Sequence, residues 1–143
     1  METMKFTVSN EVEVTEKMVK DVLCCGFEGG VGYWCQISGY KFPIGLNRKN
    51  VEFPHIDLPV LEGGGVKCQD ACKEENDGEE EFPETILDLE KVKYGLGLLM
   101  SGKDKNGKDL QPRHRYNFLN ENTDSETGDV FIQLALFGEI VFG

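Results

Sequence analysis

Two segments of this sequence combine residue types that bind small molecules. In the first, GFEGGVGYW at residues 26–34, glycines stand beside aromatic side chains and one carboxylate, Glu28. Glycine lets a backbone come close to a neighbour, and an aromatic face offers that neighbour a stacking surface. The neighbour is either a ligand, whose sugar or amino groups would donate to Glu28, or the core of the protein itself, with Glu28 bracing its own turn. The candidate binding residues here are Phe27, Glu28, Gly29, Gly30, Tyr33 and Trp34.

The second segment, PRHRYN at residues 112–117, is basic within an acidic chain. Guanidinium groups suit phosphate, so Arg113 with His114 predicts a contact to a phosphate-bearing small molecule. The alternative is that the arginines only balance nearby surface carboxylates. Asp129 and Gln133 lie four residues apart on one face of an expected helix. They either join the site or form the solvent-exposed face of that helix. The candidates from this part are Arg113, His114, Asn117, Asp129 and Gln133.

The sequence carries few patterns that are typical of enzymes. It lacks a phosphate-binding loop with a lysine, a nucleophile elbow and a helical histidine pair. A cysteine nucleophile with His55 or His114 as base is left open, because sequence alone does not show which side chains meet. Cys68 and Cys72 have a spacing that zinc ligands use, but buried or incidental thiols are favoured and metal binding stays open. We therefore favour a binding protein and predict no cofactor and no metal.

Charge and length limit the classes of partner. Twenty-six acidic residues against fifteen basic ones give a net charge of −11, which repels nucleic acid but suits a basic protein partner. The 143 residues suit a single domain. No apolar run is long enough for a membrane span, and the first residues lack a secretory signal. An odd count of five cysteines fits reduced thiols, so we expect a cytosolic protein without a membrane partner.

The expected elements place the first segment between a helix and a strand. Alternating apolar residues over 4–14 predict a strand or hairpin, and Thr15 is a plausible cap of a helix that ends at Gly26. A strand over 31–37 would then point Tyr33 and Trp34 to opposite sides, so that only one of them faces the core.

The middle of the chain, residues 38–83, predicts an irregular insert. It holds four of the five prolines, a triple glycine and an acidic loop over 73–81. A hairpin through residues 51–53 and 58–64 is one way to order it. We expect the acidic loop to be solvated.

The last third predicts most of the helices. A strand over 85–87 leads into a helix that Asp88 caps, with two internal glycines that predict close packing against another backbone. A short helix begins at Pro112, and a further helix begins at a capping box of Thr123 and Glu126 and stops at Gly138. Residues 139–143 suit a last strand. Together these elements predict an α+β domain over residues 1–143, with a small mixed or antiparallel sheet packed with three to four helices and an irregular insert.

Four segments resemble a family of small proteins encoded by bacteriophages and other mobile elements. They are GFEGGVGYWC at 26–35, YGLGLLM at 94–100, PRHRYNFLNEN at 112–122 and TGDVFIQLALFGEIVFG at 127–143. The resemblance covers residues 15–37 and 84–143. The family pattern has Asp in place of Asn117 and a small residue such as Ala in place of Gly128, so an acid–base role of that Asp would be impaired here. This difference favours binding over catalysis.

The resemblance implies a counter-defence role in the host cytosol. Phage accessory proteins of this size include sponges for nucleotide immune signals and inhibitors of nucleases. Our leading hypothesis is that the chain sequesters a small nucleotide-like immune signal, with Phe27, Tyr33 or Trp34 stacked on the base and Arg113 and His114 at phosphate. The alternative is an acidic inhibitor of a host defence nuclease that mimics nucleic acid, as anti-CRISPR or anti-restriction proteins do. The apolar C-terminal segment also suits a homo-oligomer.

Overall fold

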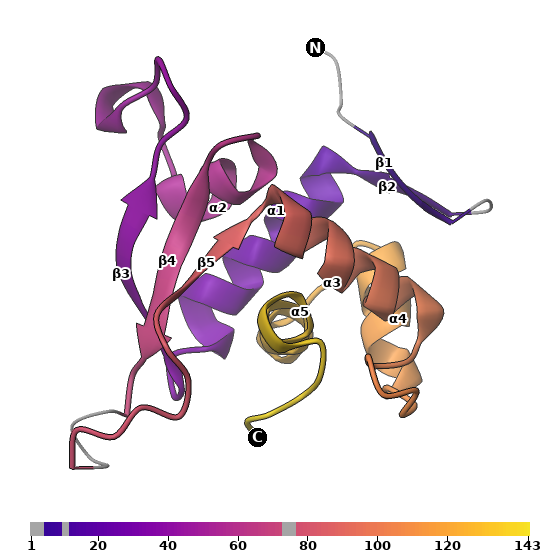
Figure 1. The fold of residues 1–143 in the computed structure, drawn as a ribbon. Helices are drawn as coiled ribbons and strands as arrows, with labels where there is room; N and C mark the ends of the chain where they lie inside the picture. The colour runs from indigo at the N-terminus through magenta and orange to yellow at the C-terminus, as the bar shows by residue number, and fades with distance from the viewer. Residues whose placement is uncertain (1–4, 10–11, 73–76) are drawn as a thin grey trace.

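The computed structural model describes residues 5–9, 12–72 and 77–143, and within them the chain has an α+β fold (Figure 1). Three antiparallel strands form a sheet in the order β3-β4-β5, and a separate hairpin pairs β1 with β2. The strands are β1 (Lys5–Ser9), β2 (Val12–Thr15), β3 (Cys35–Lys41), β4 (Gly65–Asp70) and β5 (Thr85–Asp88). The α-helices are α1 (Glu16–Cys25), α2 (Pro54–Asp57), α3 (Leu89–Ser101), α4 (Pro112–Leu119) and α5 (Ser125–Phe137). The predicted fold class and the N-terminal hairpin are confirmed.

Helix α5 is the centre of the helical part of the molecule. It packs against α1, α3 and α4, and Figure 1 shows it in the middle of the helices. A single cluster of buried apolar side chains joins these helices to the sheet; it includes Val22, Val66, Leu87, Leu96, Phe118 and Phe131. No helix in the described part of the chain is long and apolar enough to cross a membrane.

Helix α1 begins and ends where the sequence predicts, with Gly26 just past its last residue, but the chain does not leave the helical path at this glycine. Thr15 caps it by accepting a 3.2 Å hydrogen bond from the Met18 amide. Gly26 keeps a right-handed conformation, with φ −68°, and the chain continues as a π-helical turn over Gly26–Gly30. This turn lies against α5 so closely that a Cβ on Gly128 would come within 2.3 Å of the Gly26 nitrogen. The glycines therefore bring two backbones of the same chain together.

The predicted strand over 31–37 is displaced toward the C-terminus. Residues 31–34 form a turn, and β3 begins only at Cys35. The expectation that Tyr33 and Trp34 face different environments holds in this turn, because Tyr33 is 51% exposed and Trp34 only 1%.

The segment 38–83 is more regular than the sequence suggests. It contains the end of β3 and the whole of β4, the central strand of the sheet. The hairpin predicted through 51–53 and 58–64 is wrong, because α2 and a 3₁₀ turn over Leu58–Val60 occupy this part of the chain. Residues 73–76 of the expected acidic loop lie outside the described residues, and residues 77–81 are exposed.

The starts of α3 and α5 follow from aspartate caps. Asp88 accepts a 3.0 Å bond from the Lys91 amide, as predicted, whereas α5 is capped by Asp124 rather than by Thr123. Asp124 accepts from the amide of Thr127 at 2.8 Å, and this bond lowers the pKa of the Asp124 carboxyl.

Left-handed glycines end both helices, Gly102 with φ 74° after α3 and Gly138 with φ 76° after α5. The two helices also pack closely against each other. Gly95 of α3 lies against Ala135 of α5, and a Cβ added to Gly95 would be 2.9 Å from the Ala135 Cβ. This contact confirms the close packing predicted for Gly95. Gly97 has no such neighbour within 4 Å.

The strand predicted over 139–143 does not form. These residues cross the end of α5 as a coil, and the amides of Val141 and Phe142 donate to Oε1 of Gln133 at 2.7 and 2.8 Å. A side chain thus satisfies backbone groups that a neighbouring strand would otherwise have to satisfy.

Candidate functional site

A cavity of about 520 Å³ lies beside α5 and brings together four of the eleven predicted site residues. Tyr33 comes from the turn before β3, His114 from α4, and Asp129 and Gln133 from α5. Six residues of the loop 104–111, the C-terminal coil, and Glu126 and Val130 of α5 complete the wall. The cavity therefore collects side chains from both of the segments that the sequence singles out.

Asp129 holds the wall of this cavity together. Its carboxylate is 8% exposed and accepts three side-chain hydrogen bonds. Oδ2 accepts from the Tyr33 hydroxyl at 2.6 Å, and Oδ1 accepts from Trp34 Nε1 at 2.7 Å and from Gln133 Nε2 at 2.9 Å. Burial, and then the bond to Asp129, raises the pKa of the Tyr33 hydroxyl to about 12, so Tyr33 stays a neutral donor at physiological pH.

Gln133 fixes the C-terminal side of the cavity. Besides accepting from the two amides named above, it donates through Nε2 to the carbonyl of Phe142 at 3.0 Å. Gln133 is only 1% exposed, and both the oxygen and the nitrogen of its side-chain amide make hydrogen bonds. The C-terminal coil is therefore held as part of the wall rather than resting loosely on the surface.

His114 enters the cavity from α4 as a neutral side chain. It is buried, and Nδ1 lies 2.9 Å from the hydroxyl of Thr127. Burial, with Arg113 as the next cause, lowers the pKa of the imidazole below its ordinary value. Asn117, the other candidate on this helix, donates to the same hydroxyl at 3.4 Å and does not line the cavity.

Arg113 lies outside the cavity and is engaged by its neighbours. Its guanidinium donates to Glu126 and, through Nε at 2.8 Å, to Gln111. The predicted contact of Arg113 to phosphate does not fit this placement, because a surface carboxylate already occupies the guanidinium. The alternative, in which the arginine balances a nearby carboxylate, describes what is found.

The glycine segment is used mainly within the protein. A Cβ on Gly30 would lie 2.3 Å from the Ser125 carbonyl oxygen, and one on Gly29 would lie 3.5 Å from the Ser125 side chain, so both glycines face α5. Trp34 is stacked on Phe142 with ring centroids 5.0 Å apart and planes within 7°. A stacking role of Trp34 toward a ligand does not fit, because its ring is covered by the core.

Phe27 and Glu28 lie away from the cavity, around His55 of α2. Glu28 Oε2 accepts from the Cys24 thiol at 3.1 Å and lies 2.8 Å from His55 Nε2, and the hydrogen bonds from His55 and Cys24 lower the pKa of the Glu28 carboxyl. Phe27 meets the edge of the His55 ring at 6.4 Å. Glu28 thus braces its own turn, the second of the two alternatives.

The described cysteines are not arranged as nucleophiles. Cys24 meets Glu28 rather than a histidine, and burial followed by that hydrogen bond raises the pKa of its thiol to about 11. Burial also raises the pKa of Cys25, and a hydrogen bond with Cys35 together with burial raises that of Cys68. Within the described ranges, no group of three or more His, Cys, Asp or Glu side chains is placed to hold a metal ion.

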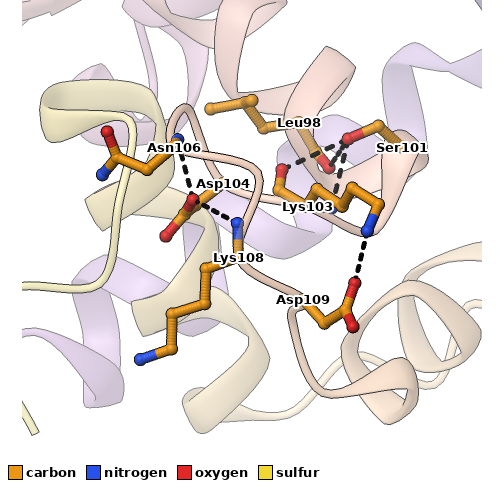
Figure 2. Close-up of polar contacts among 7 residues, drawn as sticks. All are labelled: Leu98, Ser101, Lys103, Asp104, Asn106, Lys108 and Asp109. Atoms are coloured by element: carbon orange, nitrogen blue, oxygen red, sulfur yellow. Dashed lines mark hydrogen bonds and ion pairs between the residues drawn. The ribbon is translucent and has the colours of Figure 1, made fainter.

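The cavity is lined by five carboxylates, those of Asp104, Asp109, Glu126, Asp129 and Glu139. Two of them, Asp104 and Asp109, come from the loop between α3 and α4, which no pattern in the sequence places at the site. Figure 2 shows how the loop is built: Asp104 accepts from the amides of Asn106 at 2.8 Å and Lys108 at 3.0 Å, and Asp109 pairs with Lys103 at 2.6 Å. Lys108 is the only lysine on the cavity wall, and Figure 2 shows its side chain extending away from Asp109. The sequence Lys105-Asn106-Gly107 is typical of a turn, but nothing in the sequence predicts that this loop lies close to α5.

A scan of the chain against protein-family models found no matching family, and searches among curated proteins and solved structures gave no significant match.

Proposed function

We propose that this protein sequesters a small nucleotide-like molecule in the cavity beside α5, and that it holds this ligand by its base and sugar rather than by phosphate. The observation that carries the proposal is the convergence of Tyr33, His114, Asp129 and Gln133 on one cavity from three separate segments. A volume of about 520 Å³ falls within the range of small-molecule sites.

The chemistry of the wall supports a base and a sugar as the bound groups. Tyr33 keeps half of its surface exposed and can offer its ring, while Val130 and Ile140 supply apolar contacts. Carboxylates accept hydrogen bonds from amino and hydroxyl groups, and the neutral His114 adds a polar group without charge.

The same wall disfavours a ligand with several phosphates. Asp109, Glu126 and Glu139 are each paired with a cation, which leaves Asp104 and Asp129 against Lys108, so the local charge keeps the sign of the whole chain by a small margin. A single phosphate near Lys108 is the most that this balance allows.

Binding without turnover fits Cys24 and Cys25, because the raised pKa values of their thiols make them poor nucleophiles. The counter-defence setting, in which the protein would act in the host cytosol on an immune signal, rests on the resemblance to phage-encoded proteins. Sequestration in that setting requires tight, stoichiometric binding and no catalytic group.

The test is native mass spectrometry and calorimetry with matched nucleosides and their mono-, di- and triphosphates. We expect one ligand per chain, weaker binding with each added phosphate, and at least about tenfold weaker binding of the best ligand by Tyr33→Ala. Tyr94→Ala is the control, because Tyr94 is similarly exposed at 47% but does not line the cavity. A protein that takes up no member of the panel, or that prefers triphosphates, would contradict the proposal. The same spectra measure whether the chain forms a homo-oligomer.

A second candidate function is inhibition of a basic defence nuclease by the acidic surface. The exposed run Asp77–Glu81 favours it, because these residues are open to solvent and do not line the cavity. Replacement of Glu79, Glu80 and Glu81 by Gln should weaken binding to such a partner and flatten its salt dependence, whereas ligand uptake in the cavity should not change.

A further inference from the structure

A second cavity, of about 720 Å³, lies between the end of α3 and one face of α4. Positions 112, 115, 116 and 119 of α4 recur at helical spacing and all line it, while His114 and Phe118 of the same helix are buried. Its apolar lining includes the partly buried Leu110 and Leu119, which pack against the core, whereas Leu99 beneath them is buried. The cavity thus lies at the edge of the core, on the outer face of α4.

Arg115 is the only basic side chain on the wall of this cavity. Its Nε donates to the carbonyl of Met100 at 3.0 Å, which anchors the guanidinium while leaving its terminal nitrogens for another acceptor. Among the described residues no carboxylate lies within ion-pair distance of Arg115, and Asp109, the one acidic residue on the wall, is paired with Lys103 at 2.6 Å. A fixed arginine without a carboxylate partner is suited to bind an anion.

Tyr116 stands beside Arg115 on the same helix face and is 64% exposed. An aromatic ring that shares a cavity wall with a guanidinium and with leucine side chains suits a flat apolar body with one negatively charged end. The single arginine within a chain of net charge −11 balances one negative charge and no more.

We propose that this cavity is a second binding site, next to the one beside α5, and that it takes a small aromatic monocarboxylate. The carboxylate pairs with the terminal nitrogens of Arg115, and the aromatic body lies on Leu110 and Leu119 against the ring of Tyr116. The two cavities share Asp109, Leu110 and Gln111, but only the second has an arginine on its wall. They therefore select different ligands.

The probe for this site is 2-naphthoate, with the neutral 2-naphthamide as a matched ligand of the same shape. In amide NMR titrations we expect saturable shifts from naphthoate at residues 99–102 and 115–120, and at least about tenfold weaker binding of naphthamide. Arg115→Gln should weaken naphthoate by a similar factor. Arg48→Gln is the matched control, because Arg48 also donates to one backbone carbonyl, that of Val51 at 2.7 Å, and lines neither cavity.

Four outcomes would overturn the proposal. Three are the absence of saturable shifts, equal binding of the acid and the amide, and equal binding of naphthoate by the wild type and a folded Arg115→Gln variant. The fourth is a set of shifts confined to Val130 and Gln133, which would place naphthoate in the first cavity. Arg115 is exposed, so Arg115→Gln should fold, and its unperturbed amide spectrum verifies this. Tyr116→Ala is a second variant, which should weaken both naphthoate and naphthamide.

Discussion

The hydroxyl of Tyr33 donates to Oδ2 of Asp129 across 2.6 Å, joining two residues that lie 96 positions apart in the chain. The neighbouring Trp34 donates to the other oxygen of the same carboxylate, although its ring is buried and that of Tyr33 is half exposed. One carboxylate of α5 therefore orients the whole turn before β3. The glycine-rich segment and the α5 polar residues, which looked like two halves of a ligand site, are first of all partners of each other.

Replacing Asp129 by Ala should destabilise the fold. Alanine has no acceptor, so the buried donors Trp34 Nε1 and Gln133 Nε2 both lose the oxygen to which they donate. We expect a loss of about 1–3 kcal/mol in the free energy of unfolding, measured by urea denaturation followed through the fluorescence of Trp34. Glu126→Gln is the control, because it breaks an exposed ion pair and should cost less than about 1 kcal/mol. Equal effects of the two changes would contradict the central role of Asp129.

Two glycines of α3 should respond in opposite ways to alanine. A Cβ at Gly95 would lie 3.0 Å from the Ala135 backbone, so Gly95→Ala should push α3 and α5 apart and cost about 1–3 kcal/mol. Gly97 has open space around it, and Gly97→Ala should stabilise the helix by up to about 1 kcal/mol. Thermal unfolding of the two variants in parallel gives the sign of each effect. A stabilised Gly95→Ala variant would show that the helices do not pack this closely.

Acidification should weaken the fold through His114. Burial lowers the pKa of the folded imidazole below the ordinary value of about 6.5, so the unfolded chain binds a proton more readily. The free energy of unfolding is therefore unaffected by His114 protonation above about pH 6.5. Below that pH it declines, by at most about 1.4 kcal/mol per pH unit. Urea denaturation at pH 7.5 and pH 5.5 should show this loss in the wild type and in His55→Gln, but a smaller loss in His114→Gln. An unchanged pH dependence in His114→Gln would exclude His114 as the cause.

The parts of the fold that sequence predicts are those determined by local chemistry. The caps at Thr15 and Asp88, the proline at the start of α4 and the left-handed Gly138 depend on residues within one or two turns. Strand β4 was missed because it stands among glycines and prolines, and only pairing with β3 and β5 on both sides makes it a central strand.

The sequence predicted several of the residues of the candidate site, but it did not predict which side chains contact one another. The spacing of Asp129 and Gln133 placed them on one helix face, and both line the cavity. That Arg113 pairs with Glu126 and that Trp34 stacks on Phe142 depends on how distant segments meet. The loop 104–111, which supplies Asp104, Asp109 and Lys108 to the cavity wall, carries no binding motif, so its role appears only in three dimensions.

Gln133→Leu should release the C-terminal coil while leaving α5 in place. Leucine has a similar volume and keeps the helix, but it removes the acceptor of the Val141 and Phe142 amides and the donor to the Phe142 carbonyl. Hydrogen exchange should therefore accelerate by about tenfold or more at these two amides, since each net hydrogen bond is worth about 1 kcal/mol. The Gly138 amide serves as the internal control, because it donates to the Leu134 carbonyl and needs no contact with residue 133. If protection at 141 and 142 stayed at the wild-type level, the coil would be held by the stacking of Phe142 on Trp34 rather than by Gln133.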